Sequence, residues 1–150
     1  MRWDELVDTV REYDGSNVEC YQVNIGSPDV NRFAWLSCFL HRWISPCGYR
    51  AEAHAGLDPR TIYALRVAWC QGSAHVLCSI AKELGFRACR VERFSATRSH
   101  ATAEILIGDE WIEFDPHFGL IHFGCYDRLA DEFFEGAMYD AWTDVRRVEV

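Results

Sequence analysis

The sequence predicts an α+β fold, with helices in the first half of the chain packed on an antiparallel sheet formed by the second half. Up to Gly85, apolar residues recur at helical spacing, whereas from Phe86 onward short strand-like runs alternate with turn residues. The 150 residues are 49% hydrophobic and 14% aromatic. This composition suffices for one core, so we expect a single domain over residues 1–150.

Four helices are predicted in the first half, with a strand over residues 18–25 and a turn over residues 26–29 between the first two. The second helix should end at Ser45-Pro46, because the residue before a proline disfavours helical geometry. The third should begin at Asp58-Pro59, an N-cap residue followed by proline at the first helical position. Apolar spacing defines the first two helices: Trp3, Leu6, Val7 and Val10, then Phe33, Leu36, Leu40, Trp43 and Ile44.

The fourth helix has a cysteine, Cys70, on its first turn. Gly85 ends this helix, and its apolar stripe consists of Leu77, Ile80, Ala81 and Leu84. Unpaired backbone N–H groups and the helix dipole at the first turn favour a thiolate. Cys70 is therefore a candidate nucleophile.

Strands dominate the second half of the predicted fold. We expect a strand over residues 86–94, a polar loop over 95–99, a hairpin over 101–115 and a fourth strand within 119–125. Residues 126–138 show helical spacing, and residues 145–150 form a possible last strand.

The hairpin brings a histidine and an aspartate together. Gly108-Asp109 suits a two-residue type II′ turn, which pairs Ile107 with Glu110. In that register His100 and Asp115 lie diagonally on one sheet face, roughly 7–8 Å apart between backbones, within reach of a side-chain hydrogen bond. The same face carries Glu104 and Glu113, and His117 lies opposite His100.

Cys70, His100 and Asp115 can serve as a nucleophile, its base and the carboxylate that orients the base. Each has a plainer interpretation: a packed cysteine, a satisfied strand histidine, and an aspartate that starts a turn before Pro116. The shared register favours the functional interpretation. His75 lies on the other side of the helix from Cys70 and is expected to be structural or part of a pocket rim.

Three motifs carry a resemblance to the transglutaminase-like superfamily of papain-like thiol enzymes. The first runs from Trp69-Cys70-Gln71-Gly72-Ser73-Ala74 to Leu84-Gly85-Phe86. The second, His-Ala-x-x-Glu, corresponds to residues 100–104, and the third, x-Trp-x-x-x-Asp-Pro, corresponds to residues 110–116. The resemblance covers residues 31–124, and it implies a papain-like core with a cysteine, histidine and aspartate triad.

The chain departs from this pattern at two positions. Thr102 stands where an aromatic residue is common after the histidine, which predicts a more open or reshaped wall of the acyl pocket. Cys89 stands where an arginine often follows Gly-x-x-Ala, and Arg90 is one step later. Because successive strand residues point to opposite faces, we do not expect Arg90 to replace that arginine.

Several further residues are candidates for supporting roles. An oxyanion needs two donors, of which the backbone N–H of Cys70 is one. Gln22, Trp35 and the Trp69 indole remain alternatives for the other. Glu104 either supports His100 or is solvated, and His117 is a candidate substrate contact.

The cysteines and histidines argue against a metal or a disulfide framework. The seven cysteines are odd in number and form no Cys-x-x-Cys pair, which favours a reducing compartment and packing roles for all but Cys70. His117 and His122 have no paired cysteines at zinc-finger spacing, and no segment has the pattern of a calcium loop. No metal or organic cofactor is expected.

Charge and hydropathy limit which partners and which cellular location the sequence predicts. A net charge of −8 with scattered basic residues argues against nucleic acid. No apolar run reaches the length of a membrane span, and the N-terminus lacks the features of a signal peptide. We therefore expect a cytoplasmic protein that does not enter the membrane.

The leading hypothesis is an acyl-transfer enzyme in which Cys70 attacks an amide, ester or thioester and forms an acyl-enzyme. The substrate would be a small-molecule, peptide or carrier-bound acyl group, released to an amine or to water. One alternative is transfer from a carrier thioester, as in arylamine N-acetyltransferases. Another is a non-catalytic binding module that keeps the fold. Loops over residues 45–57 and 92–99 are expected to shape the pocket.

Overall fold

Four helices precede a five-stranded antiparallel sheet in the computed structural model, which describes residues 1–14, 27–45, 56–96, 99–117, 120–122 and 142–150. The helices are α1 (Trp3–Glu12), α2 (Pro28–Trp43), α3 (Pro59–Leu65) and α4 (Cys70–Glu83). The strands are β1 (Ala88–Phe94), β2 (Ser99–Ile107), β3 (Glu110–Asp115), β4 (Leu120–His122) and β5 (Asp144–Glu149). Their order in the sheet is β4-β3-β2-β1-β5. The predicted α+β class is confirmed.

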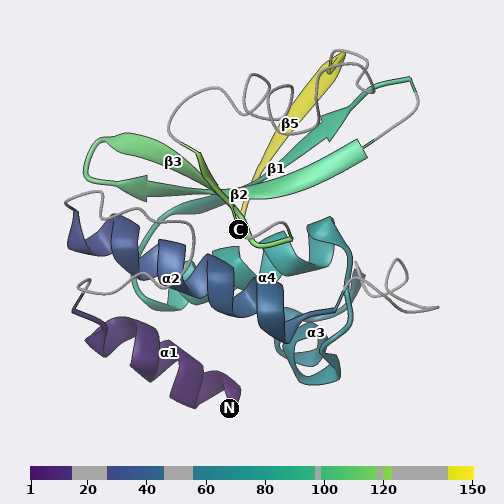
Figure 1. The fold of residues 1–150 in the computed structure, drawn as a ribbon. Helices are drawn as coiled ribbons and strands as arrows, with labels where there is room; N and C mark the ends of the chain where they lie inside the picture. The colour runs from purple at the N-terminus through teal and green to yellow at the C-terminus, as the bar shows by residue number, and fades with distance from the viewer. Residues whose placement is uncertain (15–26, 46–55, 97–98, 118–119, 123–141) are drawn as a thin grey trace.

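The described helices lie on one side of the sheet, as Figure 1 shows. α4 packs against β1 and β2, and α2 packs against α4 and β3. α1 lies on the side of the helical layer away from the sheet. No helix in the described part of the chain is long and apolar enough to cross a membrane.

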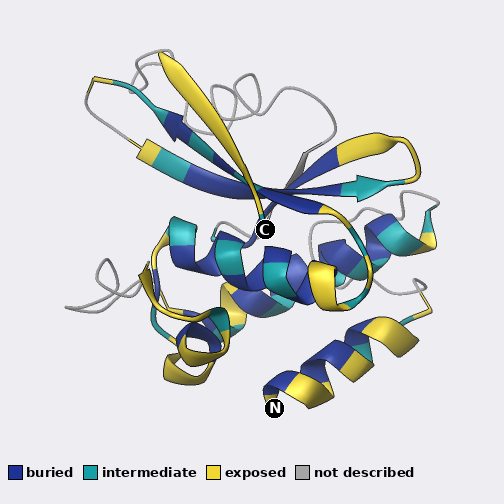
Figure 2. Cartoon of the chain, turned by 180° about the vertical axis from the view of Figure 1, so that it is seen from behind, coloured by how far each residue is buried: buried dark blue, intermediate teal, exposed yellow. Residues whose placement is uncertain are grey.

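The core fills the space between the helices and one face of the sheet. Alternate residues of β2 and β3 point into it, among them Ala103, Ile105 and Phe114, which are fully buried. Figure 2 shows this burial at the centre of the sheet, in contrast to the exposed strand β5. The opposite face of β2 and β3 carries polar residues that are also buried: Thr102, Glu104, Glu113 and Asp115.

The predicted helices are present, with a difference at the start of α2. All four apolar positions named for α1 are buried, and Asp58 caps α3 by accepting a hydrogen bond from the Thr61 N–H at 3.2 Å. The predicted turn over residues 26–29 is wrong in its second half, because Pro28 and Asp29 belong to α2. Pro28 is the first residue of the helix and Ser27 is its N-cap. The predicted strand over 18–25 and helix over 126–138 lie outside the described residues.

The end of α4 explains why β1 begins later than predicted. Gly85 has a positive φ of 90°, and the N–H of Phe86 donates to the Ala81 carbonyl at 3.0 Å. Because that N–H closes the helix, it is not free for the sheet, and β1 begins at Ala88. The last predicted strand is confirmed as β5, and three residues of the fourth are observed as β4.

The hairpin has the predicted register. Ile107 pairs with Glu110 and Glu104 pairs with Glu113. Gly108 has a positive φ of 65° and Asp109 does not, which fits a type II′ turn. His100 and Asp115 therefore share a sheet face, as the sequence predicts.

One cysteine prediction is wrong. Cys38 of α2 is disulfide-bonded, whereas Cys70, Cys78 and Cys89 are free thiols. An odd number of cysteines excludes a complete set of internal pairs but does not exclude one pair. Tertiary packing decides which cysteines form a disulfide, and the spacing of cysteines along the sequence does not reveal the pairing.

Candidate active site

The start of α4 places Cys70 at the edge of the core. The segment before it is held by two backbone hydrogen bonds, Ser45 N–H to the Arg66 carbonyl at 2.8 Å and Ala68 N–H to the Ser45 carbonyl at 3.1 Å. Gly72, in the first turn, packs so closely that an added Cβ would lie 2.7 Å from the Cβ of Ala68. Cys70 is the first residue of the helix, is half-buried and has a free thiol.

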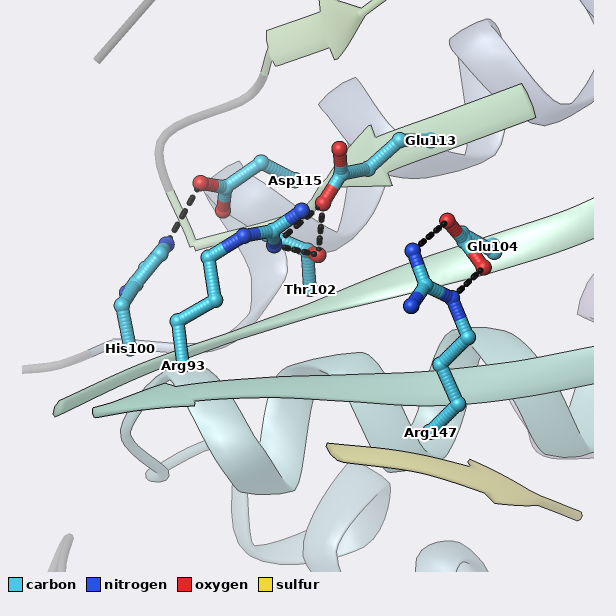
Figure 3. Close-up of polar contacts among 7 residues, drawn as sticks. All are labelled: Arg93, His100, Thr102, Glu104, Glu113, Asp115 and Arg147. Carbon is cyan, nitrogen blue, oxygen red and sulfur yellow. Dashed lines mark hydrogen bonds and ion pairs between the residues drawn. The ribbon is translucent and has the colours of Figure 1, made fainter. Parts of the chain in front are cut away.

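The His100 and Asp115 side chains meet as predicted. Nε2 of His100 lies 2.7 Å from Oδ2 of Asp115 (Figure 3), and the Asp115 side chain is fully buried. The backbone N–H of His117 donates to the other carboxylate oxygen, Oδ1, at 3.0 Å. Both oxygens of Asp115 are thereby oriented, and its contact with Nε2 leaves Nδ1 of the ring for Cys70, a neighbour that helps to raise the pKa of His100.

The surroundings of His100 favour its protonated form. Burial lowers the pKa of the imidazole, but the charge of Asp115, its hydrogen bond and the contact with Cys70 outweigh this and raise the pKa to about 10. His117 behaves differently: burial lowers its pKa, and the attraction of Asp115 only partly opposes this. Of these two histidines, His100 is the one suited to hold a proton taken from a thiol.

A pocket of about 250 Å³ opens beside Cys70 and His100. It lies where β1 ends, β2 begins and α4 starts, and its remaining walls are Trp69, Gln71, Glu92, Phe94, Ser99 and Ala101. The Gln71 side chain donates to Oε1 of Glu92 at 2.9 Å, and Arg90 Nε donates to the same oxygen at 2.9 Å. Most of the pocket surface is apolar. In its polar part, the charge of Glu92 is balanced by that of Arg90.

Sequence reasoning did not single out Gln71 and Glu92. Gln71 was identifiable only as the neighbour of Cys70. The part played by Glu92 depends on the pairing of β1 with β2, which sets it opposite Ala101. Residues 95–98, which join these strands, include no glycine or proline that would define a turn type, so the sequence does not determine that register.

The supporting candidates separate into two groups. Trp69 lines the pocket, and the His117 ring lies 5.9 Å from the His100 ring between centroids. Trp35 of α2 stacks between Tyr13 and Phe39. It is not among the described residues that line this pocket. Its prediction as an oxyanion or substrate residue therefore has no support in the geometry. Gln22 lies outside the described residues.

The structure places three other residues that the sequence analysis discussed. Glu104 forms a two-pronged ion pair with Arg147, at 3.0 and 3.3 Å, and does not contact His100 among the described residues. Thr102 is fully buried and is not among the described residues that line the pocket. His75 contacts Arg90 at 3.3 Å and is not among the described residues that line the pocket.

Metal ligands are not assembled at this site. Among the described residues, no three His, Cys, Asp or Glu side chains form a cluster that could hold a metal ion. The groups that converge are a thiol, an imidazole that can take the thiol proton, and a carboxylate that can orient the imidazole.

Comparison with known proteins agrees with this arrangement. The model of the Transglutaminase-like superfamily matches residues 34–116, which is more than half of the chain. The chain belongs to the transglutaminase-like superfamily. All three converging residues lie within the matched region.

Structural comparison supports the fold. The chain resembles the crystal structure of a candidate cysteine protease from Cytophaga hutchinsonii, with a TM-score of 0.53 and 16% sequence identity. The match covers 98% of this chain and 50% of that protein, so this chain spans about half the length of its structural neighbour. No curated protein matches the sequence significantly.

Proposed function

We propose that the protein is a cysteine enzyme of the transglutaminase-like superfamily that forms an acyl-enzyme on Cys70. The observation that carries the proposal is the order of contacts: Cys70 at the start of α4, His100 beside it, and Asp115 2.7 Å from the far side of the His100 ring. A pocket opens at the thiol, where a substrate carbonyl can approach.

The reaction requires the proton of the Cys70 thiol to be held on Nδ1 of His100, a state that the raised pKa of His100 favours. Asp115 accepts the hydrogen bond from Nε2–H, holds that tautomer and stabilises the imidazolium. Sγ then attacks the carbonyl carbon of an amide, ester or thioester, and the carbonyl π electrons move to oxygen. The backbone N–H of Cys70, unpaired at the helix start, donates to this oxyanion.

Collapse of the tetrahedral intermediate completes the first half. The oxyanion re-forms the carbonyl, the bond to the leaving group breaks, and the leaving group takes the proton from His100. A thioester on Cys70 remains. Water or an amine then loses a proton to His100 and attacks this thioester, which releases a carboxylic acid or an amide and restores the thiol.

The identity of the acceptor decides between hydrolase and acyltransferase. The name of the structural neighbour favours peptide hydrolysis, and the superfamily name favours transfer to an amine. Both outcomes pass through the same acyl-enzyme, so the acyl-enzyme is the species to detect first.

The test is mass spectrometry of the native protein. Iodoacetamide should label Cys70 before Cys78 and Cys89, since both are buried and burial raises the pKa of each of their thiols. In a separate sample whose thiols are unmodified, an activated ester or thioester should add its acyl mass to Cys70, and release of the acyl group with and without a primary amine should be compared.

One control variant completes the test. Cys89→Ala is the matched control and should acylate like wild type. A Cys70 that reacts no faster than a free thiol and gains no acyl mass would leave the chain as a non-catalytic binding module.

A further inference from the structure

Two linked polar side chains, Gln71 of α4 and Glu92 of β1, form part of the wall of the pocket beside Cys70. Nε2 of Gln71 donates to Oε1 of Glu92 at 2.9 Å, and Nε of Arg90 donates to the same oxygen, also at 2.9 Å. The second oxygen of Glu92, Oε2, has no hydrogen-bond partner among the described residues, and it is accessible to solvent. Because Glu92 lines the pocket, Oε2 is its atom that a ligand can reach.

The contact with Glu92 also fixes the orientation of the Gln71 amide. A carboxylate oxygen accepts hydrogen bonds and does not donate them, so the NH₂ group of Gln71 faces Glu92. Gln71 and Arg90 approach from two different elements, the start of α4 and the strand β1. The Glu92 carboxylate is therefore held at one oxygen, and the other is left to act as an acceptor.

Arg90 compensates the charge of Glu92 from outside the pocket. Its guanidinium is held between Glu92 and His75, with Nη1 at 3.3 Å from Nδ1 of His75. Burial and Arg90 lower the pKa of His75, which favours a neutral imidazole that accepts from Arg90. Arg90 is not among the described residues that line the pocket. A ligand thus meets a carboxylate oxygen whose charge is already balanced, and this suits a neutral N–H donor.

The other pocket walls suit an aliphatic chain. The Trp69 indole is 47% exposed, and it borders the pocket together with the Phe94 ring. Aromatic rings offer a large apolar surface to such a chain. A substrate in this pocket would have its reacting carbonyl at Cys70, an apolar part along the two rings and a donor group at Glu92.

We propose that Glu92 is a specificity-determining residue whose Oε2 accepts a hydrogen bond from a neutral N–H group, such as a carboxamide, on the acyl part of the substrate. This inference rests on the proposed function, because it names the kind of acyl group that reaches Cys70. A carboxylate at that position of the substrate would be repelled by Oε2. A methyl ketone would leave Oε2 without a donor.

The substitution Glu92→Gln should reverse the hydrogen-bond character of this wall. Gln71 and Arg90 both donate to the position of Oε1, so the carbonyl oxygen of the new side chain takes that position. Its NH₂ group then takes the position of Oε2. The variant presents a donor to the pocket where wild type presents an acceptor, with little change in shape.

The experiment compares three acyl groups that differ only at their far end. The probes are the phenyl thioesters of adipamic acid, 6-oxoheptanoic acid and adipic acid, which end in a carboxamide, a methyl ketone and a carboxylate. A second set, shorter by one methylene, allows for the distance between Cys70 and Glu92. Mass spectrometry of the native protein follows the acyl mass on Cys70, and each rate constant is divided by that of the same probe with a free thiol.

Wild type should react with the carboxamide about tenfold faster than with the ketone, the effect of one hydrogen bond to a charged acceptor. The carboxylate should react most slowly. In Glu92→Gln the carboxamide and the ketone should agree within about twofold, because both offer a carbonyl oxygen to the new NH₂ group. The carboxylate should gain about tenfold relative to the carboxamide, since a repulsive charge is replaced by a donor.

Glu149→Gln is the matched control. It makes the same substitution in a carboxylate that pairs with Arg87 and is not among the described residues that line the pocket. Its rate ratios should follow wild type, which separates contact with Glu92 from a change in net charge. If thermal unfolding shows that Glu92→Gln does not fold, Glu92→Ala replaces it. That variant removes the acceptor, so it should also lose the preference for the carboxamide.

Two results would overturn the inference. In one, Cys70 of wild type is acylated, but the carboxamide and the ketone react at the same rate in both sets. In the other, folded Glu92→Gln slows all three probes equally and keeps the wild-type ratios, as a purely structural role would require. Failure of the proposed function gives a different result, because wild-type Cys70 would then gain no acyl mass from any probe, and the inference would fall with it.

Discussion

Asp115 shows how single atoms define the candidate site. Its two carboxylate oxygens have separate partners: Oδ2 meets Nε2 of His100, and Oδ1 accepts from the His117 N–H. The backbone bond fixes the rotation of the carboxylate. Consequently one oxygen faces the imidazole, and the tautomer with hydrogen on Nε2 is favoured.

Asp115→Asn should lower kcat by roughly three to four orders of magnitude while KM changes little. The amide oxygen can still accept from His117, which turns the NH₂ group toward Nε2 of His100. That donor favours the tautomer with hydrogen on Nδ1, which cannot accept the thiol proton. Steady-state kinetics with circular dichroism would check this, and a folded variant within about twofold of wild type would contradict the role of Asp115.

Cys70→Ala should abolish both acylation and turnover and leave the fold nearly intact, because the half-buried thiol lies at a helix start and not in the packed interior. Mass spectrometry, activity and thermal unfolding would be compared with wild type. A folded variant that keeps more than about a hundredth of the activity would remove Cys70 from the nucleophile position.

At the scale of elements, α4 and the β2–β3 hairpin locate the site. The first turn of α4 packs on the residues before it through Gly72. The hairpin register brings His100 and Asp115 to one face. A change in α4 tests how Cys70 is positioned, and a change in the hairpin tests how His100 and Asp115 are brought together.

Gly72→Ala should destabilise the protein by about 1–3 kcal/mol. Alanine in a helix is normally favoured over glycine by about 1 kcal/mol. Here the new Cβ meets the Cβ of Ala68 at 2.7 Å, and that atom cannot move without its backbone. Urea unfolding would measure the difference, and a more stable variant would show that the segment before Cys70 yields easily.

One residue inserted between Gly108 and Asp109 should reduce activity far more than stability. The insertion slips the register, so that His100 and Asp115 fall on opposite faces, while a bulge can keep much of the core buried. Turnover and unfolding would be measured together. Activity close to wild type in this variant would contradict the dependence of the site on the hairpin.

At the scale of the whole molecule, the pair of His100 and Asp115 links stability to pH. The pKa of His100 is raised to about 10 in the folded protein, against about 6.5 in an unfolded chain. Its contribution to stability is therefore fully present below about pH 6.5 and is lost as the pH rises toward 10.

The difference in unfolding free energy between wild type and His100→Gln should shrink as the pH rises from 6.5 to 10. His75→Gln is the opposite control. Burial and Arg90 lower the pKa of His75, so wild type should lose stability relative to that variant as the pH falls below about 6.5. Urea unfolding across this range would check both signs, and a constant difference for His100→Gln would contradict the pairing.

Local rules made much of the fold and site predictable from sequence. Proline and N-cap signals located α3, glycine ended α4, and a two-residue turn set the register of β2 and β3. These features act over a few residues, so they are visible in sequence. The resemblance carried by three motifs pointed to the superfamily that the comparison then showed.

The sequence by itself therefore determined the α+β class, the position of Cys70 at a helix start and the meeting of His100 with Asp115, because short-range geometry governs each of them. Tertiary structure alone decided that Cys38 forms a disulfide, that Glu92 enters the pocket and that Arg93 pairs with Glu113. These outcomes depend on contacts between segments whose register or packing no local pattern specifies. A charged side chain that is removed from water is costly unless another charged or polar group pairs with it, and burial therefore favours specific ion pairs.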